Sequence, residues 1–441
     1  MAKKHTDASA VIVGGGIAGV ACAKELAHAG VAVTVIDKHN YTQFQPLLYQ
    51  VATGMLGPTD IARPLRGIFK RHDNIFVKEA EVVKVDPAAK SVTTSDGSTM
   101  SGDYLVLAMG ARANFFKTEG AEEHTFPLYS LTDAERLRSR LFQVLEDADL
   151  DQRHIQQGAL NFVVIGGGPT GVETAGALAD LVNHTLPSMF HDMPLNAAQV
   201  YIIDHGSNLL AAFSDDAHDY VTKVLHKYGV LMLMGKSVTQ ITPQKVVLND
   251  GTEIVTRVVV WAGGNMAADL AGACGIPQGR GGRIDVEPDL SIDGFPGVFA
   301  IGDVANIRGS DGEVLPQLGS VALQAGVTAG KNILADIDGK PAKGFHYFDK
   351  GIMAMIGKRA AIAEVGKHRH ELHGTIAFAA WLGVHAWLMS GMRQRIDAFI
   401  SWGWDYFSTT RATSVIDRPD ACMIDWDDDD DEKVELGVDK A

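Results

Sequence analysis

The sequence predicts an α/β fold with two doubly wound parallel-sheet domains, followed by a helical C-terminal segment. Two observations support this prediction. The segment SAVIVGGG at residues 9–16 recurs as NFVVIGGG at residues 161–168, each time before a helix rich in small residues. Short β-branched runs also alternate with helix-forming runs through the first 115 residues, which is typical of buried parallel strands joined by helices. The 441 residues exceed what one ordinary hydrophobic core holds.

The first copy of the pattern is expected to begin with buried strands at residues 10–13 and 31–36, joined by a helix. The turn-forming segments DPAAK and SDGS then bound two runs, at residues 76–85 and 91–94, which we expect to form antiparallel strands. A third buried strand is expected at residues 104–107. The polar stretch at 118–157 has a helical pattern.

The second copy begins at residue 161, and its second strand is expected at residues 199–203. A further strand at 298–302 and a helix at 316–334 follow. From about residue 344 the composition changes, and four of the six tryptophans lie between Trp381 and Trp404. These shifts divide the chain into a first domain (1–117 and 291–345), a second domain (118–290), a C-terminal region (346–420) and an acidic disordered tail (421–441).

Composition excludes several classes of protein. The formal net charge of −15 argues against nucleic-acid binding, which requires a basic excess. The three cysteines lie far apart and form no CxxC pair, so a zinc ribbon and a dithiol redox motif are excluded. The N-terminal residues contain no apolar run, so we expect no export signal and a location on the cytoplasmic side.

The first glycine motif lies where a strand ends and a helix begins. Gly14 permits a tight turn, Gly16 lets the backbone approach a pyrophosphate, and Gly19 lets the helix pack on the strand. Asp37 ends the following strand, where a carboxylate accepts hydrogen bonds from ribose hydroxyls. The combination predicts a Rossmann-type dinucleotide site.

The second motif repeats this arrangement with Gly166, Gly168, Gly171 and Asp204. Because a carboxylate repels a 2′-phosphate and no arginine follows Asp204, we expect NADH in preference to NADPH. Two nucleotide sites in one chain indicate that one nucleotide passes electrons to the other, most economically NADH to a bound flavin.

Glu173 lies in the first turn of the helix that follows the second glycine motif. Two interpretations carry equal weight: an acid that merely suits a helix N-terminus, or a carboxylate placed near the nicotinamide and flavin rings.

The C-terminal region has two apolar features. Residues 374–392 contain no Asp, Glu, Lys or Arg, which is marginal for a membrane-spanning helix. Ile396, Phe399, Ile400, Trp404 and Phe407 then share one helical face, opposite three polar residues (Asp397, Ser401 and Asp405). This pattern is typical of a helix lying in the membrane interface, and an ordinary core-facing helix is the alternative.

Four longer segments carry a resemblance to a known family. VFAIGDVAN (298–306) and VVVWAGGN (258–265) resemble motifs of two-dinucleotide flavoproteins. DKHNYTQFQPLLYQVATGMLGPTDIARPLR (37–66) and WLGVHAWLMSGMRQRIDAFISWGWDYFSTTRATSVI (381–416) are similar specifically to type II NADH dehydrogenases, the single-subunit NADH:quinone oxidoreductases. The resemblance covers roughly residues 8 to 418. It implies noncovalent FAD and NADH as cofactors, a membrane quinone as acceptor, and no proton pumping.

Carried over by position, the resemblance implies cofactor-binding roles for a first set of residues. FAD would be held by Gly14, Gly16, Gly19, Asp37, Lys38, Gly302 and Asp303, and NADH by Gly166, Gly168, Gly171, Glu173 and Asp204, with Gly263 as a further cofactor contact.

The acceptor side depends on a second set of residues. The segment around Ala322 and Gln324 matches the family's quinone-site segment, with Ser320 and Ala325 where glutamines are common in the family. Glu173, Gln324 and Lys350 are the candidate catalytic residues, with Lys350 as a possible partner of Glu173 on the proton route to quinone.

The remaining expectations concern partners. We expect a peripheral protein on the cytoplasmic face of the cell membrane that binds the bilayer surface through residues 374–411 and forms a homodimer. Basic residues add to this surface: Lys367, Arg369, Arg393, Arg395, Arg411 and Arg418. His368, His370 and His373 are a conceivable metal cluster, but the interleaved cations favour no metal.

Two rival functions stay open. One is an NADH-dependent reductase of a small protein carrier, which has no use for an aromatic C-terminus. The other is a flavoprotein that senses NADH and signals through a partner. Slow turnover with every quinone would favour the second.

Overall fold

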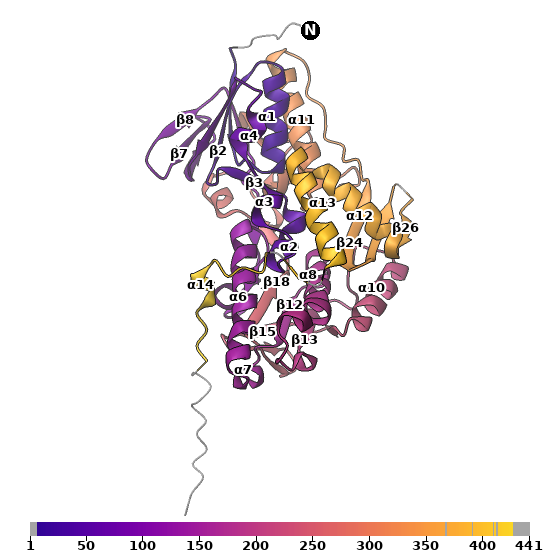
Figure 1. The fold of residues 1–441 in the computed structure, drawn as a ribbon. Coiled ribbons are helices and arrows are strands. Elements are labelled where there is room, and N and C mark those ends of the chain that lie inside the picture. Colours follow the sequence, from indigo (N-terminus) through magenta and orange to yellow (C-terminus); the bar gives the residue numbers. More distant parts are fainter. Residues whose placement is uncertain (1–6, 367, 390, 409, 412, 427–441) are drawn as a thin grey trace, which may run out of the picture.

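The computed structural model describes residues 7–366, 368–389, 391–408, 410–411 and 413–426. Its first half, meaning the part of the fold that holds the first glycine motif, is built on a six-stranded sheet (Figure 1). The strand order is β21 (Ser291–Ile292), β22 (Phe295–Ala300), β9 (Tyr104–Leu107), β1 (Ser9–Val13), β2 (Ala32–Asp37) and β5 (Ile75–Glu79). The strands from β22 to β5 are parallel, and only β21 runs antiparallel to its neighbour.

The second half repeats this plan with a parallel five-stranded sheet. Its order is β11 (Phe126–Pro127), β18 (Val258–Trp261), β12 (Asn161–Ile165), β13 (Gln199–Asp204) and β14 (Leu231–Met234). The two predicted doubly wound sheets are therefore confirmed. In each sheet, the strand that precedes the glycine motif has a neighbouring strand on both sides. The motif therefore lies at the carboxyl edge of the sheet, where this fold binds its ligand.

Each large sheet is accompanied by a three-stranded antiparallel sheet. The first contains β6 (Val82–Asp86), β7 (Ser91–Thr94) and β8 (Thr99–Ser101), and the second contains β15 (Val238–Ile241), β16 (Lys245–Leu248) and β17 (Glu253–Val255). The antiparallel strand expected at residues 76–85 is wrong in part. Its first half is β5, which pairs in parallel with β2, because the chain changes sheets at Ala80 and Glu81.

Smaller pairings complete the strand inventory. β24 (Gly351–Gly357), β25 (Ala360–Val365) and β26 (His370–His373) form an antiparallel sheet in the C-terminal region. Two-stranded pairs are formed by β3 (Tyr41–Gln43) with β4 (Ala62–Pro64), β10 (Ala111–Ala113) with β19 (Asn265–Ala267), and β20 (Ile284–Asp285) with β23 (Ala305–Asn306).

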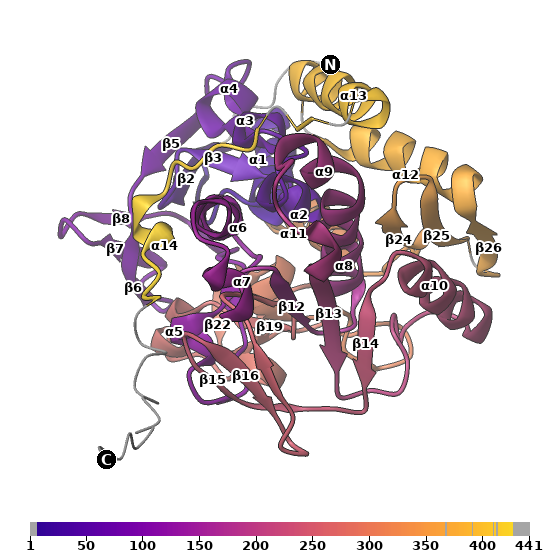
Figure 2. The same ribbon diagram turned by 60° about the horizontal axis from the view of Figure 1, so that its bottom comes forward.

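Helices cover the sheets and lie at their edges (Figures 1 and 2). α1 (Ile17–His28) packs closely on α11 (Gly319–Ile337), where a Cβ at Gly326 would lie 2.2 Å from the Ala18 carbonyl oxygen. The other helices are α2 (Leu48–Ala52), α3 (Pro58–Ile61), α4 (Leu65–Phe69), α5 (Ala121–His124), α6 (Leu131–Leu150), α7 (Arg153–Gln156), α8 (Pro169–Asp180), α9 (Leu186–Met189), α10 (Asp215–Lys227), α12 (Gly374–Leu388), α13 (Met392–Phe407) and α14 (Pro419–Cys422).

Two large hydrophobic cores cross the expected domain boundaries. Residues from the stretch 267–290 pack in the core of the first sheet, so the chain returns to the first half well before residue 291. The core of the second sheet also takes in α2 and the C-terminal elements β24, β25, α12 and α13. The C-terminal region is therefore packed onto the second half of the molecule.

The end of the described chain lies along α6 (Figure 2). Residues 419–422 form α14, and the Trp426 ring stacks on His154 at 4.0 Å between centroids. The indole N–H of Trp426 donates to Asp147 at 2.9 Å. The expectation of disorder from residue 421 is therefore wrong for residues 421–426, whereas the acidic residues 427–441 lie outside the described residues.

Candidate functional site

The first glycine loop has the geometry that its sequence predicts. A Cβ at Gly14, where φ is +106°, would lie 2.2 Å from the Ala108 carbonyl oxygen, and one at Gly19 would lie 1.9 Å from the Gly14 carbonyl oxygen. These two glycines are therefore required by the turn and by the contact between α1 and β1. A Cβ at Gly16 would meet no atom within 4 Å, so this backbone is open to a ligand.

Asp37 lies at the end of β2 and turns back to the same loop. Its Oδ2 accepts a hydrogen bond from the Gly15 N–H at 2.6 Å, and its Oδ1 accepts one from the His39 N–H at 2.8 Å. The carboxylate is thereby held beside the open face of the loop, where a ribose is bound in this fold. Lys38 follows on the exposed side.

Asp303 enters the same region from β22, which is next to β9 in the sheet. Gly302, at φ +72°, brings the backbone so close to α1 that a Cβ would lie 3.0 Å from the Ala18 Cβ. The hydroxyl of Tyr129 donates to Asp303 Oδ2 at 3.3 Å, and burial raises the pKa of Asp303. Asp303 therefore lies next to α1, the helix that begins at the first glycine loop.

The second loop has the same backbone contacts as the first. A Cβ at Gly166 would lie 2.3 Å from the Ala262 carbonyl oxygen, next to Gly263, and one at Gly171 would lie 1.8 Å from the Gly166 carbonyl oxygen. A Cβ at Gly168 would meet nothing within 4 Å. Asp204 Oδ2 accepts from the Gly167 N–H at 2.5 Å. Both loops thus leave the same backbone open at the start of a helix, an arrangement that fits the pyrophosphate of a dinucleotide.

A mainly apolar cavity of about 330 Å³ lies between the second half and the C-terminal helices. Its wall is supplied by α2, α8, β24, α12 and α13. Three residues of α8 line it at helical spacing: Glu173, Ala177 and Asp180. Large apolar side chains with a few convergent polar groups are typical of a site for an apolar small molecule.

Glu173 is one of three carboxyl groups that line this cavity, and it is buried. Its Oε1 accepts hydrogen bonds from the Met355 N–H at 3.0 Å and from the Trp381 indole N–H at 3.3 Å. Burial raises its pKa to about 8, and the two hydrogen bonds oppose this shift only in part. Glu173 is therefore mostly protonated at neutral pH, in contrast to an acid at a solvated helix terminus.

Tyr49 and Gln50 line the same cavity as Glu173 and were not among the residues predicted from the sequence. The Trp402 indole N–H donates to Gln50 Oε1 at 2.7 Å, and Gln50 Nε2 donates to the Tyr49 hydroxyl at 3.0 Å. Both residues lie within the family-specific segment at 37–66 and line the cavity. Their place in that segment is the sequence signal that would have found them, whereas the full burial of Gln50 is evident only from the structure.

The predicted quinone residues on α11 contact the chain that leads to β24. Ser320 Oγ lies 2.9 Å from the Tyr347 hydroxyl. Gln324 donates to the Phe348 carbonyl oxygen at 3.1 Å and accepts from the Phe348 N–H at 2.9 Å. Ala322 is buried on α11. These residues fix the segment 347–348, and the cavity of Glu173 is lined by others.

The predicted pairing of Lys350 with Glu173 is wrong. Lys350 is exposed, and its Nζ lies 5.3 Å from the ring centroid of Trp387. Glu173 is buried and bonded to Met355 and Trp381. The sequence does not show that Glu173 bonds to Met355 inside β24, whereas Lys350 lies just before this strand and next to Trp387.

The apolar face of the amphipathic helix α13 points away from the protein. Ile400, Trp404 and Phe407 are 65%, 59% and 88% exposed. The opposite, polar face packs on the protein: Ser401 donates to Asp60 of α3 at 3.4 Å, and Asp405 lines the cavity. The alternative of an ordinary core-facing helix is therefore excluded. Within the described residues, no helix is long and apolar enough to cross a membrane.

Three of the predicted surface cations make ion pairs with other parts of the protein. Arg411 is buried in ion pairs with Asp180 and Asp405, and Arg418 pairs with Glu135 of α6. Arg369 pairs with Asp349 and Glu364, whereas Lys367 lies outside the described residues. The histidines at 370 and 373 lie at the two ends of β26, and the described part of the chain contains no cluster suited to a metal ion.

Comparison with known proteins agrees with this geometry. Residues 8–326 match the pyridine nucleotide-disulphide oxidoreductase family. Two type II NADH:quinone oxidoreductases of Mycobacterium tuberculosis, Ndh and NdhA, are 33% and 34% identical to the chain. Each match covers 92% of this chain, and 89% and 88% of the respective relative.

Solved structures extend the comparison to the fold. A structure of NDH2 from Plasmodium falciparum in complex with NADH is 20% identical, with a TM-score of 0.85, and the match covers 92% of this chain and all of that one. The sulfide:quinone oxidoreductase of Aquifex aeolicus matches with a TM-score of 0.71 at 18% identity, over 91% of this chain and 96% of that one. From the sequence matches, the chain belongs to the type II NADH:quinone oxidoreductases, within the pyridine nucleotide-disulphide oxidoreductase family.

Proposed function

We propose that quinone is reduced in the cavity between α8, β24, α12 and α13, beside Glu173. The mainly apolar lining suits an isoprenoid quinone, and the polar groups gather where Glu173, Tyr49 and Gln50 meet. The single observation that carries this proposal is a buried carboxyl inside a mainly apolar cavity of a chain whose relatives are named NADH:quinone oxidoreductases.

The electron donor side is assigned to the two glycine loops. FAD would be held by Gly14, Gly16, Gly19, Asp37, Lys38, Gly302 and Asp303, and NADH by Gly166, Gly168, Gly171, Asp204 and Gly263. When bound, FAD supplies two-electron transfer between NADH and quinone. The residues of the loops contribute binding and orientation through their backbone N–H groups and carboxylates.

Glu173 is assigned to the proton side of the reaction. Reduction of a quinone by NADH consumes one proton from solvent besides the hydride of NADH, and the quinol carries both. A neutral carboxyl held by Met355 and Trp381 has a proton to donate to a quinone oxygen inside the cavity. The carboxylate that remains is costly to bury, which favours its reprotonation before the next turnover.

The outward face of α12 and α13 is assigned to the lipid surface. Beyond the α13 residues described above, Ile376 and Trp387 of α12 are exposed, and both helices form walls of the cavity. A large exposed apolar patch of this kind is typical of membrane-interface binding. Lipid bound to this face would lie next to the cavity and would supply its dissolved quinone.

Three finer parts of the prediction stay predictions. These are the homodimer, the location on the cytoplasmic face, and a place in a respiratory chain. Sedimentation of the detergent-purified protein tests the first, and protease access in oriented membrane vesicles tests the second.

The cavity offers a matched pair of glycines for its test. Gly403 of α13 lines the cavity, and a Cβ there would meet no atom within 4 Å. Gly383 of α12 is equally open but lies away from the cavity lining. Gly403→Leu should fill the cavity without a clash, and Gly383→Leu makes the same chemical change outside it.

Steady-state and stopped-flow kinetics then separate the two half-reactions. Gly403→Leu should raise KM for a short-chain quinone about tenfold, which is about 1.4 kcal/mol of lost binding, and leave flavin reduction by NADH unchanged. Gly383→Leu should change neither. Equal quinone kinetics in both variants would place quinone reduction elsewhere.

A further inference from the structure

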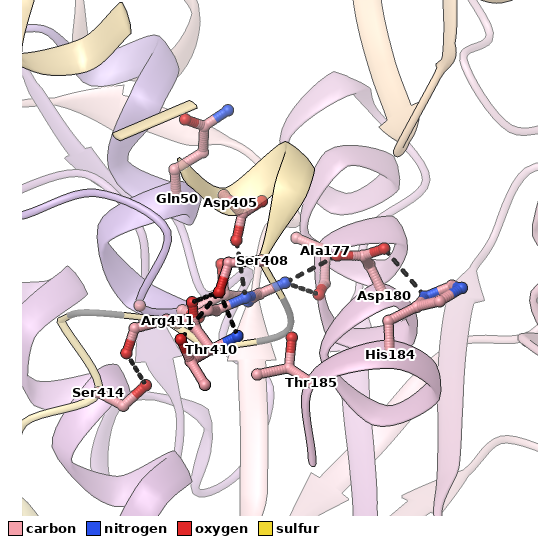
Figure 3. A network of polar contacts seen from close by, with 12 residues as sticks. Gln50, Ala177, Asp180, His184, Thr185, Asp405, Ser408, Thr410, Arg411 and Ser414 are labelled. Atoms are coloured by element: carbon pink, nitrogen blue, oxygen red, sulfur yellow. Dashed lines mark hydrogen bonds and ion pairs between the residues drawn. The ribbon is translucent and has the colours of Figure 1, made fainter. Parts of the chain in front are cut away.

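Arg411 is a buried arginine just after α13, and its guanidinium reaches back across three elements (Figure 3). Nη1 donates to the Thr53 carbonyl oxygen that follows α2, at 2.5 Å. Nη2 lies 3.0 Å from Asp180 Oδ2 and 3.5 Å from the Ala177 carbonyl oxygen, both on α8. Nε lies 3.6 Å from Asp405 Oδ1 of α13, an ion-pair distance that exceeds a hydrogen bond.

The partners of Arg411 belong to the cavity rather than to a remote interface. Ala177 and Asp180 line it from α8, and Asp405 lines it from α13. Both carboxylates are largely buried, so an unpaired negative charge on either of them would be costly. A single guanidinium therefore bridges carboxylates on α8 and α13, and its one positive charge offsets one of their two negative charges.

We propose that Arg411 is a positioning residue for quinone reduction, which holds the α13 wall of the cavity against α8. This inference rests on the proposed cavity. The planar fork of arginine suits this task, because it offers several N–H donors in fixed directions to partners on different elements. A lysine at this position has one charge but no such fork.

The C-terminal segment has other attachments, which distinguishes this role from general anchoring. Arg138 of α6 pairs with Asp417 at 2.7 Å, and Arg418 pairs with Glu135 of α6. These pairs fasten residues 417–418 onto α6 and contribute nothing to the cavity lining. Loss of the Arg418 pair should therefore loosen the same segment and leave the cavity intact.

Other charged groups also face the two carboxylates. His184 Nδ1 lies 3.1 Å from Asp180 Oδ1, and Tyr228 is near enough to Asp180 that the pKa of Tyr228 is raised further by this charge. Lys358 Nζ donates to the Asp405 carbonyl oxygen at 3.0 Å. Burial raises the pKa of Asp405, whereas Arg411 and, more weakly, Lys358 lower it.

Removal of Arg411 should consequently add a titration to quinone reduction. Burial raises the pKa of Asp405 and Arg411 lowers it, so the pKa of Asp405 should rise further when the guanidinium is removed. The kcat/KM for quinone in Arg411→Gln should then show an ionisation in addition to that of Glu173, which the wild type also has. Asp405→Asn in the Arg411→Gln background should abolish the added ionisation.

The experiment compares Arg411→Gln, Arg411→Lys and Arg418→Gln, with FAD content and flavin reduction by NADH as measures of intact fold. We expect Arg411→Gln to raise KM for a short-chain quinone about tenfold or more, as for a lost hydrogen bond to a charged group. Arg411→Lys should give a smaller rise. Arg418→Gln should leave KM and the pH profile unchanged.

The results distinguish a wrong role for Arg411 from a wrong assignment of the cavity as the quinone site. If Arg411→Gln matches Arg418→Gln in KM and pH profile while Gly403→Leu raises KM, the role of Arg411 is refuted and the cavity stands. If Gly403→Leu also leaves KM unchanged, the cavity is refuted. If Arg411→Gln loses FAD, Arg411→Lys and Asp405→Asn decide, since wild-type KM in both would refute the role.

Discussion

The indole N–H of Trp381 on α12 lies 3.3 Å from Oε1 of Glu173 on α8. This contact joins the C-terminal helices to the glycine-loop half of the molecule, across more than two hundred residues of sequence. The same carboxyl oxygen also accepts the Met355 N–H of β24. Glu173 thereby links the helix that begins at the second glycine loop to the cavity that the C-terminal helices close.

The first prediction concerns stability against pH. Burial raises the pKa of Glu173 from its ordinary value of 4.5 to about 8. Between these values the folded protein holds a proton that the unfolded chain has lost, so the free energy of unfolding falls as pH rises. The fall amounts to about 5 kcal/mol at most. In Glu173→Gln this contribution should vanish. The free energy of unfolding, measured with denaturant, should therefore change less between pH 4.5 and pH 8 than in the wild type.

The control for this prediction is Glu122→Gln, because Glu122 is exposed on α5. Its unfolding curves should follow the wild type at each pH. An unchanged slope in Glu173→Gln would show that the carboxyl ionises at its ordinary pH and would remove the basis for its role as a proton donor.

The second prediction separates two glycines of one loop. Gly168→Ala meets no atom within 4 Å, whereas Gly171→Ala places its Cβ 1.8 Å from the Gly166 carbonyl oxygen. We expect Gly168→Ala to fold with full FAD content and to lose NADH affinity. Gly171→Ala should lower the melting temperature, because α8 must move away from β12. Calorimetry and NADH titration measure the two effects, and a stable Gly171→Ala would contradict the close contact.

The third prediction concerns the choice of nucleotide. Asp204 accepts hydrogen bonds from the N–H groups of Gly167 and Gly206 at 2.5 and 2.6 Å. Asp204→Asn should raise KM for NADH about tenfold and lower the preference for NADH over NADPH, because the repulsion of a 2′-phosphate is removed. Asp37→Asn, the equivalent change in the first loop, should instead lower FAD content. If nucleotide preference is the same as in the wild type, Asp204 does not contact the ribose.

The fourth prediction tests the lipid surface. Ile400→Glu places a charge in the middle of the exposed apolar face of α13, so it should abolish sedimentation with phospholipid vesicles. Leu150→Glu is the matched control, because Leu150 is 86% exposed at the end of α6. Both variants should reduce a short-chain, soluble quinone at the wild-type rate. Equal loss of vesicle binding in the two variants would refute a specific lipid surface on α13.

Sequence was sufficient wherever local pattern determines structure. The two glycine loops, the strands that precede them and the amphipathic face of α13 all follow from short-range periodicity, and the structure confirms them. The split of residues 76–85 into β5 and β6 was missed, because the β-branched residues on both sides of Ala80 and Glu81 do not show where a strand changes sheets.

Long-range partners were the part that sequence could not supply. Arg411 and Arg418 resemble surface cations in a basic segment, yet their partners on α8, α13 and α6 turn both toward the protein. Likewise, Glu173 is an unremarkable acid in a helix until Trp381 and Met355 are placed against it. Its burial, and therefore its pKa, exists only in the folded chain.

The measurement that tests the central claim most directly is anaerobic stopped-flow absorbance of the flavin in the wild type and in Glu173→Gln. NADH is added first, and a short-chain quinone follows. We expect equal bleaching by NADH in both proteins and a recovery with quinone that is at least about tenfold slower in Glu173→Gln, a typical loss for one proton donor. Equal recovery rates in the two proteins across pH 6 to 8 would contradict quinone reduction beside Glu173.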